Sequence, residues 1–190
     1  SYKKIDDLSS DIISLQSVLT DKKTRGIFGE VNLKHIMSNV FGEKNDKVYR
    51  LQYQFDGGVI ADCVLFAPEP LGTIAIDSKF PLENYQIMVN KNNSAEVRAQ
   101  AERLFKLDVK KHIDAISSKY IIPGVTSDQA ILFLPAEAIF AEINAYHTDL
   151  IEYSYKKHVW LTSPTTLIST LTAIQIARSE ERFSRNAETD

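Results

Sequence analysis

Two aspartates and a lysine on neighbouring predicted strands are the residues of this sequence best suited to chemistry. Asp77 and Lys79 stand two residues apart in TIAIDSKF, residues 73–80, and Asp62 lies within VIADCVLF, residues 59–66. Because side chains alternate across a strand, Asp77 and Lys79 point to the same face. An ionised carboxylate among apolar neighbours is costly unless it is paired or binds a metal. If the two strands pair, Asp62 and Asp77 can converge on one metal ion.

The chemistry that such a set supports is hydrolysis of a phosphodiester bond. Two carboxylates and a backbone carbonyl provide hard oxygen ligands for Mg²⁺ or Mn²⁺. The metal polarises the phosphate and lowers the pKa of a bound water, and a nearby lysine orients or deprotonates that water. We therefore expect Asp62 and Asp77 to bind metal and Lys79 to act with the attacking water. The alternative is an Asp77–Lys79 ion pair at a strand end beside an unrelated Asp62.

Three consecutive strands are predicted to position these residues. Residues 49–55 (YRLQYQF) are rich in strand formers and end at the DGG turn sequence of residues 56–58. This turn predicts a β-hairpin with residues 59–66. Prolines and a glycine then break the chain before the third strand, residues 73–80, which Pro81 ends.

Helices and two short apolar strands make up the rest of the predicted domain. One helix is expected over residues 25–40, with Thr24 as its cap and Glu30 within it. Further helices are predicted over residues 82–92, 95–119, 137–155 and from Pro164 onward, and strands over residues 130–134 and 158–162. This order predicts an α/β fold.

Length and composition place few limits on function. The chain has 190 residues and a formal net charge of −3, which does not exclude a local basic groove for nucleic acid. Cys63 is the single cysteine, so no disulfide can form within the chain and a reducing compartment, the cytoplasm, is expected. The sequence holds no run of 18 apolar residues and predicts no membrane contact from this segment.

The first residues carry an apolar seam with heptad spacing, which divides the chain into residues 1–22 and a domain of residues 23–190. The seam consists of Ile5, Leu8, Ile12, Leu15 and Leu19. It predicts either the end of a coiled coil, which would form a homo-oligomer, or one amphipathic helix packed on the domain.

Several other polar residues can be interpreted in two ways. Glu137 either caps a helix N-terminus or takes part in the site, and capping is the stronger reading. The four histidines, His35, His112, His147 and His158, have no zinc spacing and are expected to be ordinary surface or core residues. The lysine-rich points are either phosphate contacts or solvated side chains: Lys22, Lys23, Arg25, Lys110, Lys111, Lys156 and Lys157.

Six short segments, taken together, resemble the RmuC family of bacterial DNA recombination proteins. In chain order they are RGIFGE (25–30), ADCV (61–64), IDSK (76–79), LPAEA (134–138), SPTTL (163–167) and RNAE (185–188). They extend over nearly the whole chain. Two positions depart from the family pattern, because Ala61 replaces a proline and Phe28 stands where tryptophan is common.

The resemblance implies a restriction-endonuclease-like core, with a mixed central β-sheet flanked by helices. It implies that Asp62, Asp77 and Lys79 match the PD-(D/E)xK nuclease motif and that Glu30 is a further metal-site acid. It also implies a longer protein, in which a membrane anchor and a coiled coil precede this domain. The leading hypothesis is therefore a Mg²⁺- or Mn²⁺-dependent DNA nuclease acting in recombination. A non-catalytic DNA-binding or scaffolding domain on the same fold is the alternative, and an RNase is a third reading.

Overall fold

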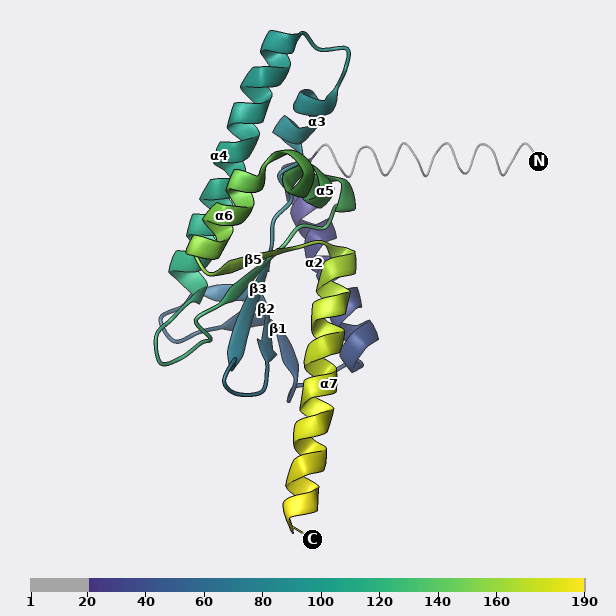
Figure 1. The fold of residues 1–190 in the computed structure, drawn as a ribbon, viewed down its shortest axis with the longest axis vertical. Helices are drawn as coiled ribbons and strands as arrows, with labels where there is room; N and C mark the ends of the chain where they lie inside the picture. The colour runs from purple at the N-terminus through teal and green to yellow at the C-terminus, as the bar shows by residue number, and fades with distance from the viewer. Residues whose placement is uncertain (1–20, 190) are drawn as a thin grey trace, which may run out of the picture.

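A computed structural model describes residues 21–189 of the chain (Figure 1). The apolar seam predicted within residues 1–22 lies outside this part. Helices and strands alternate through it in the order that the sequence predicts. None of the helices within the described part is both long and apolar enough to span a bilayer.

A five-stranded mixed β-sheet forms the centre of the fold. Its strands are β1 (Tyr49–Gln54), β2 (Ile60–Phe66), β3 (Thr73–Ser78), β4 (Ala130–Phe133) and β5 (Val159–Thr162), and they lie in chain order across the sheet. The pairs β1–β2 and β2–β3 are antiparallel, whereas β3–β4 and β4–β5 are parallel. The predicted hairpin and the mixed α/β architecture are therefore both confirmed.

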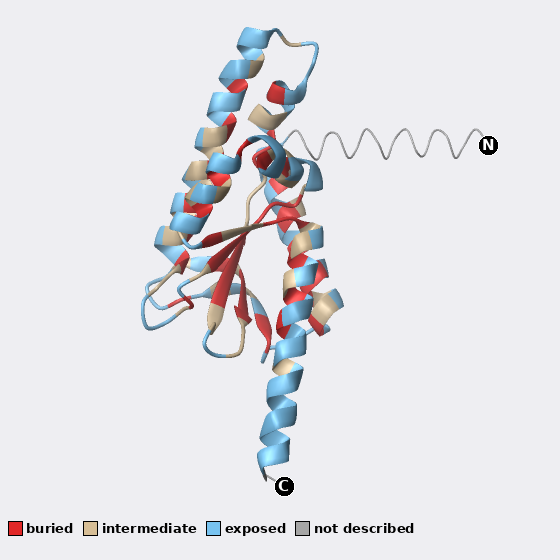
Figure 2. Cartoon of the chain, viewed as in Figure 1, coloured by how far each residue is buried: buried red, intermediate tan, exposed pale blue. Residues whose placement is uncertain are grey.

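Helices cover both faces of the sheet, as Figure 1 shows. They are α2 (Lys22–Phe41), α3 (Glu83–Val89), α4 (Ala95–Tyr120), α5 (Glu137–Tyr146), α6 (Thr148–Lys156) and α7 (Pro164–Thr189). Helices α4, α5 and α6 cover one face, while α2 and the first half of α7 cover the other. The second half of α7 is exposed and extends past the sheet (Figure 2).

The alternation of side chains along the central strands produces two separate apolar cores. Ala75 and Leu132 face α4, where Phe105 is fully buried. Ile76 and Ile131 face the opposite layer and pack with Leu33 and Leu171. Each fully buried aliphatic or aromatic side chain stabilises the fold by about 1.5–3 kcal/mol. A shift in strand register would move these side chains out of their cores, so the two cores together fix the register.

Two predicted helix boundaries are wrong. The single helix predicted over residues 137–155 is two helices, because His147 leaves helical geometry at φ −133° and its N–H closes α5 on the Ile143 carbonyl. Buried positions continue at helical spacing across this break, so their periodicity could not reveal it. The cap of α2 is Asp21, not Thr24: the Asp21 carboxylate accepts from the Lys23 N–H and from the Thr24 hydroxyl.

Glu137 has the capping role that the sequence favours, but at a different helix from its own. Its Oε1 accepts a hydrogen bond from the Thr165 N–H at 2.7 Å, in the first turn of α7. Burial works against the charged form, yet the hydrogen bonds from Thr165 and Ser163 hold the pKa of Glu137 below its ordinary value. The carboxylate thus joins the end of β4 to the start of α7, where the helix dipole favours negative charge.

Candidate active site

The antiparallel pairing of β2 with β3 brings the two predicted aspartates together. Cys63 lies opposite Ile76 and Val64 opposite Ala75, so the same register places Asp62 opposite Asp77. Directly opposed side chains in such a pair have their Cβ atoms about 4.5–5.5 Å apart. Asp62 and Asp77 therefore share the face of the sheet that α4 covers.

Neighbouring groups orient both carboxylates. The Lys79 ammonium lies 3.0 Å from Asp77 Oδ2, and the Asp77 side chain is 6% exposed while that of Lys79 is 35% exposed. The Asp62 carboxylate accepts a hydrogen bond from the Ser78 N–H at 2.8 Å. The lysine therefore extends from the buried acid toward solvent, where a substrate has access to it.

Cys63 lies on the opposite side of β2, as the alternation predicts. Its side chain is fully buried in the core beneath α2 and α7. Burial raises the pKa of the thiol, and the charge of Asp62 raises it further. Cys63 is therefore a core residue and not a member of the acid cluster.

Glu30 reaches the acid pair from α2 because the preceding residue has no side chain. A Cβ added at Gly29 would lie 2.3 Å from Ser78 Oγ and 3.4 Å from Pro135 Cγ, so the helix passes directly over the end of β3. The next residue, Glu30, lies close enough to Asp62 and Lys79 for both to alter the pKa of its carboxyl. The structure thus brings together all four predicted site residues, Glu30, Asp62, Asp77 and Lys79.

Replacement of Gly29 by alanine is expected to change the free energy of unfolding with a sign that depends on Ser78. In the wild-type background the new methyl group meets Ser78 Oγ, and overpacking of this kind costs about 1–3 kcal/mol. Against this, alanine is better than glycine within a helix by about 1 kcal/mol. We expect Gly29→Ala to destabilise the wild type but to stabilise a Ser78→Ala protein, as measured by urea unfolding. Equal effects in both backgrounds would contradict the close approach of α2 to β3.

Burial and mutual repulsion alter the acidity of the cluster. Burial and then the charge of Asp62 raise the pKa of Asp77, the Lys79 ammonium lowers it, and the result is a pKa of about 7. Burial also raises the pKa of Glu30, and Asp62 adds to this by charge and by hydrogen bonding. The raised pKa values of Asp77 and Glu30 mean that a nearby positive charge would favour their ionised forms.

Two residues of α4 that the sequence analysis did not assign to the site also lie beside it. The Tyr120 hydroxyl donates a hydrogen bond to the Ile60 carbonyl at 2.8 Å, two residues before Asp62. Burial raises the pKa of Tyr120 to about 12, with contributions from the charges of Asp77 and Asp62. His112 is half-buried, and burial followed by the charge of Lys79 lowers its pKa to about 4. The spacing of residues 112, 116 and 120 on one helix face was the available signal.

Strand β1 is irregular at Gln52, the residue that faces Asp62 across the β1–β2 pair. Leu51 pairs with Cys63 and Tyr53 with Ala61, which puts Gln52 opposite Asp62, but these two residues do not pair. Gln52 has φ +48°, a left-handed conformation that glutamine rarely adopts. Its side chain is exposed. The interrupted ladder therefore leaves the backbone around Asp62 less constrained on the β1 side.

The donors of the cluster suit a hard divalent cation, but they are not arranged as a metal site. No group of three or more His, Cys, Asp or Glu side chains among residues 21–189 is close enough to hold a metal ion. Asp77 Oδ2 lies beside the Lys79 ammonium, and Asp62 Oδ2 accepts from the Ser78 N–H. The buried carboxylate of Asp77, with its raised pKa, is the observation that fits a bound cation.

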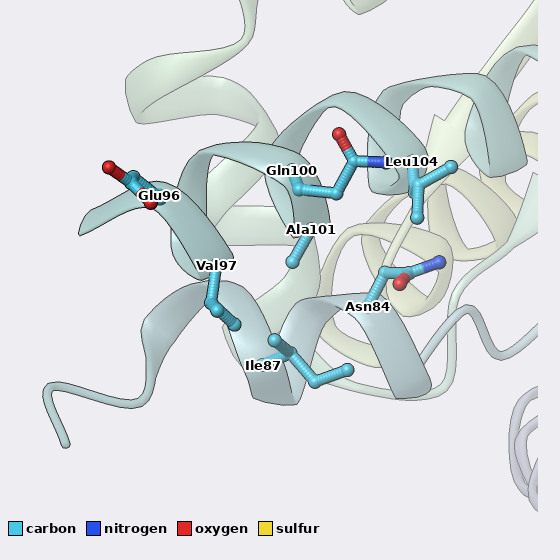
Figure 3. Close-up of a pocket in the computed structure, with 7 residues that line it drawn as sticks. All are labelled: Asn84, Ile87, Glu96, Val97, Gln100, Ala101 and Leu104. Atoms are coloured by element: carbon cyan, nitrogen blue, oxygen red, sulfur yellow. The ribbon is translucent and has the colours of Figure 1, made fainter. Parts of the chain in front are cut away.

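An apolar pocket lies away from the acid cluster. It is an apolar hollow of about 330 Å³ between α3 and α4 (Figure 3). Its walls are formed by Asn84, Ile87, Glu96, Val97, Gln100, Ala101 and Leu104. It shares no residue with the acid cluster and offers no group that would act on a phosphate.

The fold and the cluster define an α/β domain with a mixed five-stranded sheet, in which Asp62 of β2, Asp77 of β3 and the following Lys79 lie near Glu30 of α2. Residues 2–189 match the profile of the RmuC family. The chain therefore belongs to the RmuC family. No solved structure matches it with statistical significance.

Curated relatives of the chain are named DNA recombination proteins. The "DNA recombination protein RmuC homolog" of Xylella fastidiosa is 28% identical over 186 residues, which cover 91% of this chain and 39% of that protein. "DNA recombination protein RmuC" of Escherichia coli is 28% identical over 95% of this chain and 39% of its own length. The homolog of Haemophilus influenzae is 30% identical over 88% of this chain and 38% of its own. The chain thus spans about two fifths of the length of these relatives.

Proposed function

We propose that this domain is a divalent-metal-dependent nuclease that cleaves DNA during recombination, on a core of the restriction-endonuclease type. The observation that carries the proposal is the pairing of Asp62 with Asp77 across β2 and β3, with the Lys79 ammonium 3.0 Å from Asp77. The names of the curated relatives support DNA as the substrate. The buried cysteine and the reducing environment that it favours are compatible with action in the cytoplasm.

Each residue of the cluster has a role that follows from its position. Asp62 and Asp77 would hold Mg²⁺ or Mn²⁺, with Glu30 as an additional acid from α2. When bound, the ion supplies Lewis-acid polarisation of the phosphate and a water of lowered pKa. Lys79 extends from the buried acid toward solvent and donates hydrogen bonds to a phosphate oxygen or to the attacking water. Tyr120 holds the strand that carries Asp62 through the Ile60 carbonyl.

The alternative is a DNA-binding or scaffolding domain that keeps this fold without chemistry. The electrostatics argue against it, because a module without metal or catalysis gains nothing from a buried carboxylate whose pKa burial raises to about 7. The apolar pocket between α3 and α4 shares no residue with the acid cluster.

Cleavage of end-labelled linear, nicked and single-stranded DNA tests the proposal directly. We expect the wild type to cut at least one of these substrates with Mg²⁺ or Mn²⁺ and not with EDTA. Lys79→Ala is expected to lower the rate by at least about 100-fold, since a lost charge-stabilising donor typically costs that much. Lys34→Ala on α2 removes an equal charge from an exposed site and serves as the control. Equal cutting by all three proteins would indicate a contaminant, and the absence of cutting would favour the scaffold.

A further inference from the structure

A second group of polar side chains surrounds the acid cluster, and the first of them is at the start of α2. Lys22, Arg25 and Gly29 are spaced three and four residues apart, so they lie along one face of this helix. Arg25 is buried and lies 3.0 Å from Glu83 at the start of α3, directly after β3. Gly29 packs on Ser78 at the end of β3. Lys22 is therefore held beside the point where β3 ends.

Helix α4 approaches the end of β3 from the other side. Asn84 of α3 donates a hydrogen bond of 2.7 Å to Asp108, which fixes this part of α4 against α3. Lys111 and His112 follow Asp108 by three and four residues, so they lie on the same helix face one turn later. The hydrogen bond from Tyr120 to the Ile60 carbonyl fixes the far end of the helix over β2.

Lys22 on α2 and Lys111 and His112 on α4 thus approach the end of β3, where Lys79 lies, from two helices. Burial lowers the pKa of His112, the charges of Lys79, Lys22 and Lys111 lower it further, and the Asp108 carboxylate opposes them. Within residues 21–189, neither Lys22 nor Lys111 has a carboxylate at ion-pair distance, and no group hydrogen-bonds the His112 ring. Two exposed cations and a half-buried imidazole with no hydrogen bond within the described residues form a site for an anion, and the nearby Asp108 carboxylate is already held by Asn84.

We propose that Lys22, Lys111 and His112 form a phosphate-binding rim, which holds a DNA phosphate next to the one that faces Asp77 and Lys79. This inference rests on the proposed function, because it takes DNA as the substrate. A polyanion is repelled by three clustered carboxylates, and the two lysines offset that repulsion at the edge of the cluster. The neutral His112 ring contributes an N–H donor and no charge, so it orients the phosphate more than it attracts it.

The rim is tested by DNA binding in EDTA, where cleavage cannot occur. The double variant Lys22→Ala/Lys111→Ala is compared with Lys34→Ala/Lys119→Ala, which removes the same charge from exposed positions on the same two helices. Fluorescence anisotropy with a labelled duplex measures Kd from low to moderate salt. We expect the rim variant to bind at least about tenfold more weakly, and the slope of log Kd against log salt to fall by about 1.8, or 0.9 for each phosphate contact. The control pair should keep the wild-type slope.

His112 gives an independent readout. His112→Ala is expected to weaken binding by about three- to tenfold without changing the salt slope, since it removes a neutral hydrogen bond. His112→Gln keeps a donor and should recover most of this loss. Thermal unfolding checks that each variant is folded.

Two results would contradict the proposal of a phosphate-binding rim. One is equal binding by the rim and control pairs. The other is displacement of the DNA by millimolar inorganic phosphate at matched ionic strength, which would identify a site for free phosphate. If the protein does not cut DNA but the rim variant alone loses affinity, the rim stands and the nuclease proposal fails.

Discussion

Asp77→Asn is expected to lower metal-dependent DNA cleavage by at least about 1,000-fold while the protein stays folded. Asp77 lies opposite Asp62 and is the most buried of the three acids. Water or another side chain is therefore least able to take its place as a metal ligand. A bound metal supplies several kcal/mol of transition-state stabilisation, and about 4 kcal/mol corresponds to this factor in rate. Asparagine has the same shape but no charge, so the rate and not the packing should change.

The measurement is a single-turnover cleavage assay with Mg²⁺, together with circular dichroism of each protein. Asp56→Asn is the matched control, because Asp56 is exposed in the turn between β1 and β2 and the substitution is chemically identical. Isothermal titration with Mn²⁺ should show weaker metal binding by Asp77→Asn alone. A variant that cuts at the wild-type rate would remove Asp77 from the proposed metal site.

The elements that carry the site could be predicted from sequence because their local signals are strong. The DGG turn of residues 56–58 specifies a hairpin, and the alternation in TIAIDSKF assigns Asp77 and Lys79 to one face. Register follows from the same alternation, since a slip by one residue would turn Ile74 and Ile76 away from their core beneath α2 and α7 and turn Asp77 into it. The pairing of Asp62 with Asp77 is therefore a consequence of the apolar pattern around them.

The contribution of helices to the site could be predicted only in part. RGIFGE identified Glu30 through a resemblance, but the reason that Glu30 reaches Asp62 is the contact of Gly29 with Ser78, which joins residues far apart in the chain. The sequence predicts His112 to be an ordinary surface or core residue and does not assign Tyr120 to the site. Periodicity shows which face of α4 is buried, but it does not show that the face lies over the acid cluster.

The largest expected effect on stability is a pH dependence that Asp77→Asn removes. Burial raises the pKa of Asp77 from 3.8 to about 7 in the folded protein. Between these two values the folded state binds more protons than the unfolded state, so the contribution of Asp77 to stability is complete below pH 4 and is lost as pH rises through 7. The full shift corresponds to a loss on the order of 2–4 kcal/mol.

His112 acts in the opposite direction over part of this range. Burial and the charge of Lys79 lower its pKa from 6.5 to about 4, so its contribution destabilises the fold at low pH and this penalty disappears as pH rises to 6.5. The wild-type curve alone therefore mixes the two groups. The difference in free energy of unfolding between Asp77→Asn and wild type isolates Asp77.

We expect this difference to favour Asp77→Asn increasingly from pH 4.5 to pH 8, as measured by urea unfolding in EDTA at several pH values. Mg²⁺ should reverse it, because the metal binds the ionised carboxylate and stabilises only the wild type, by about 2.7 kcal/mol at a hundredfold excess over Kd. The free energy of unfolding of Asp56→Asn should change with pH and with Mg²⁺ in the same way as that of the wild type. A constant difference across the pH range would mean that Asp77 is ionised at ordinary pH, and an unchanged difference on adding Mg²⁺ would mean that the acid cluster does not bind this metal.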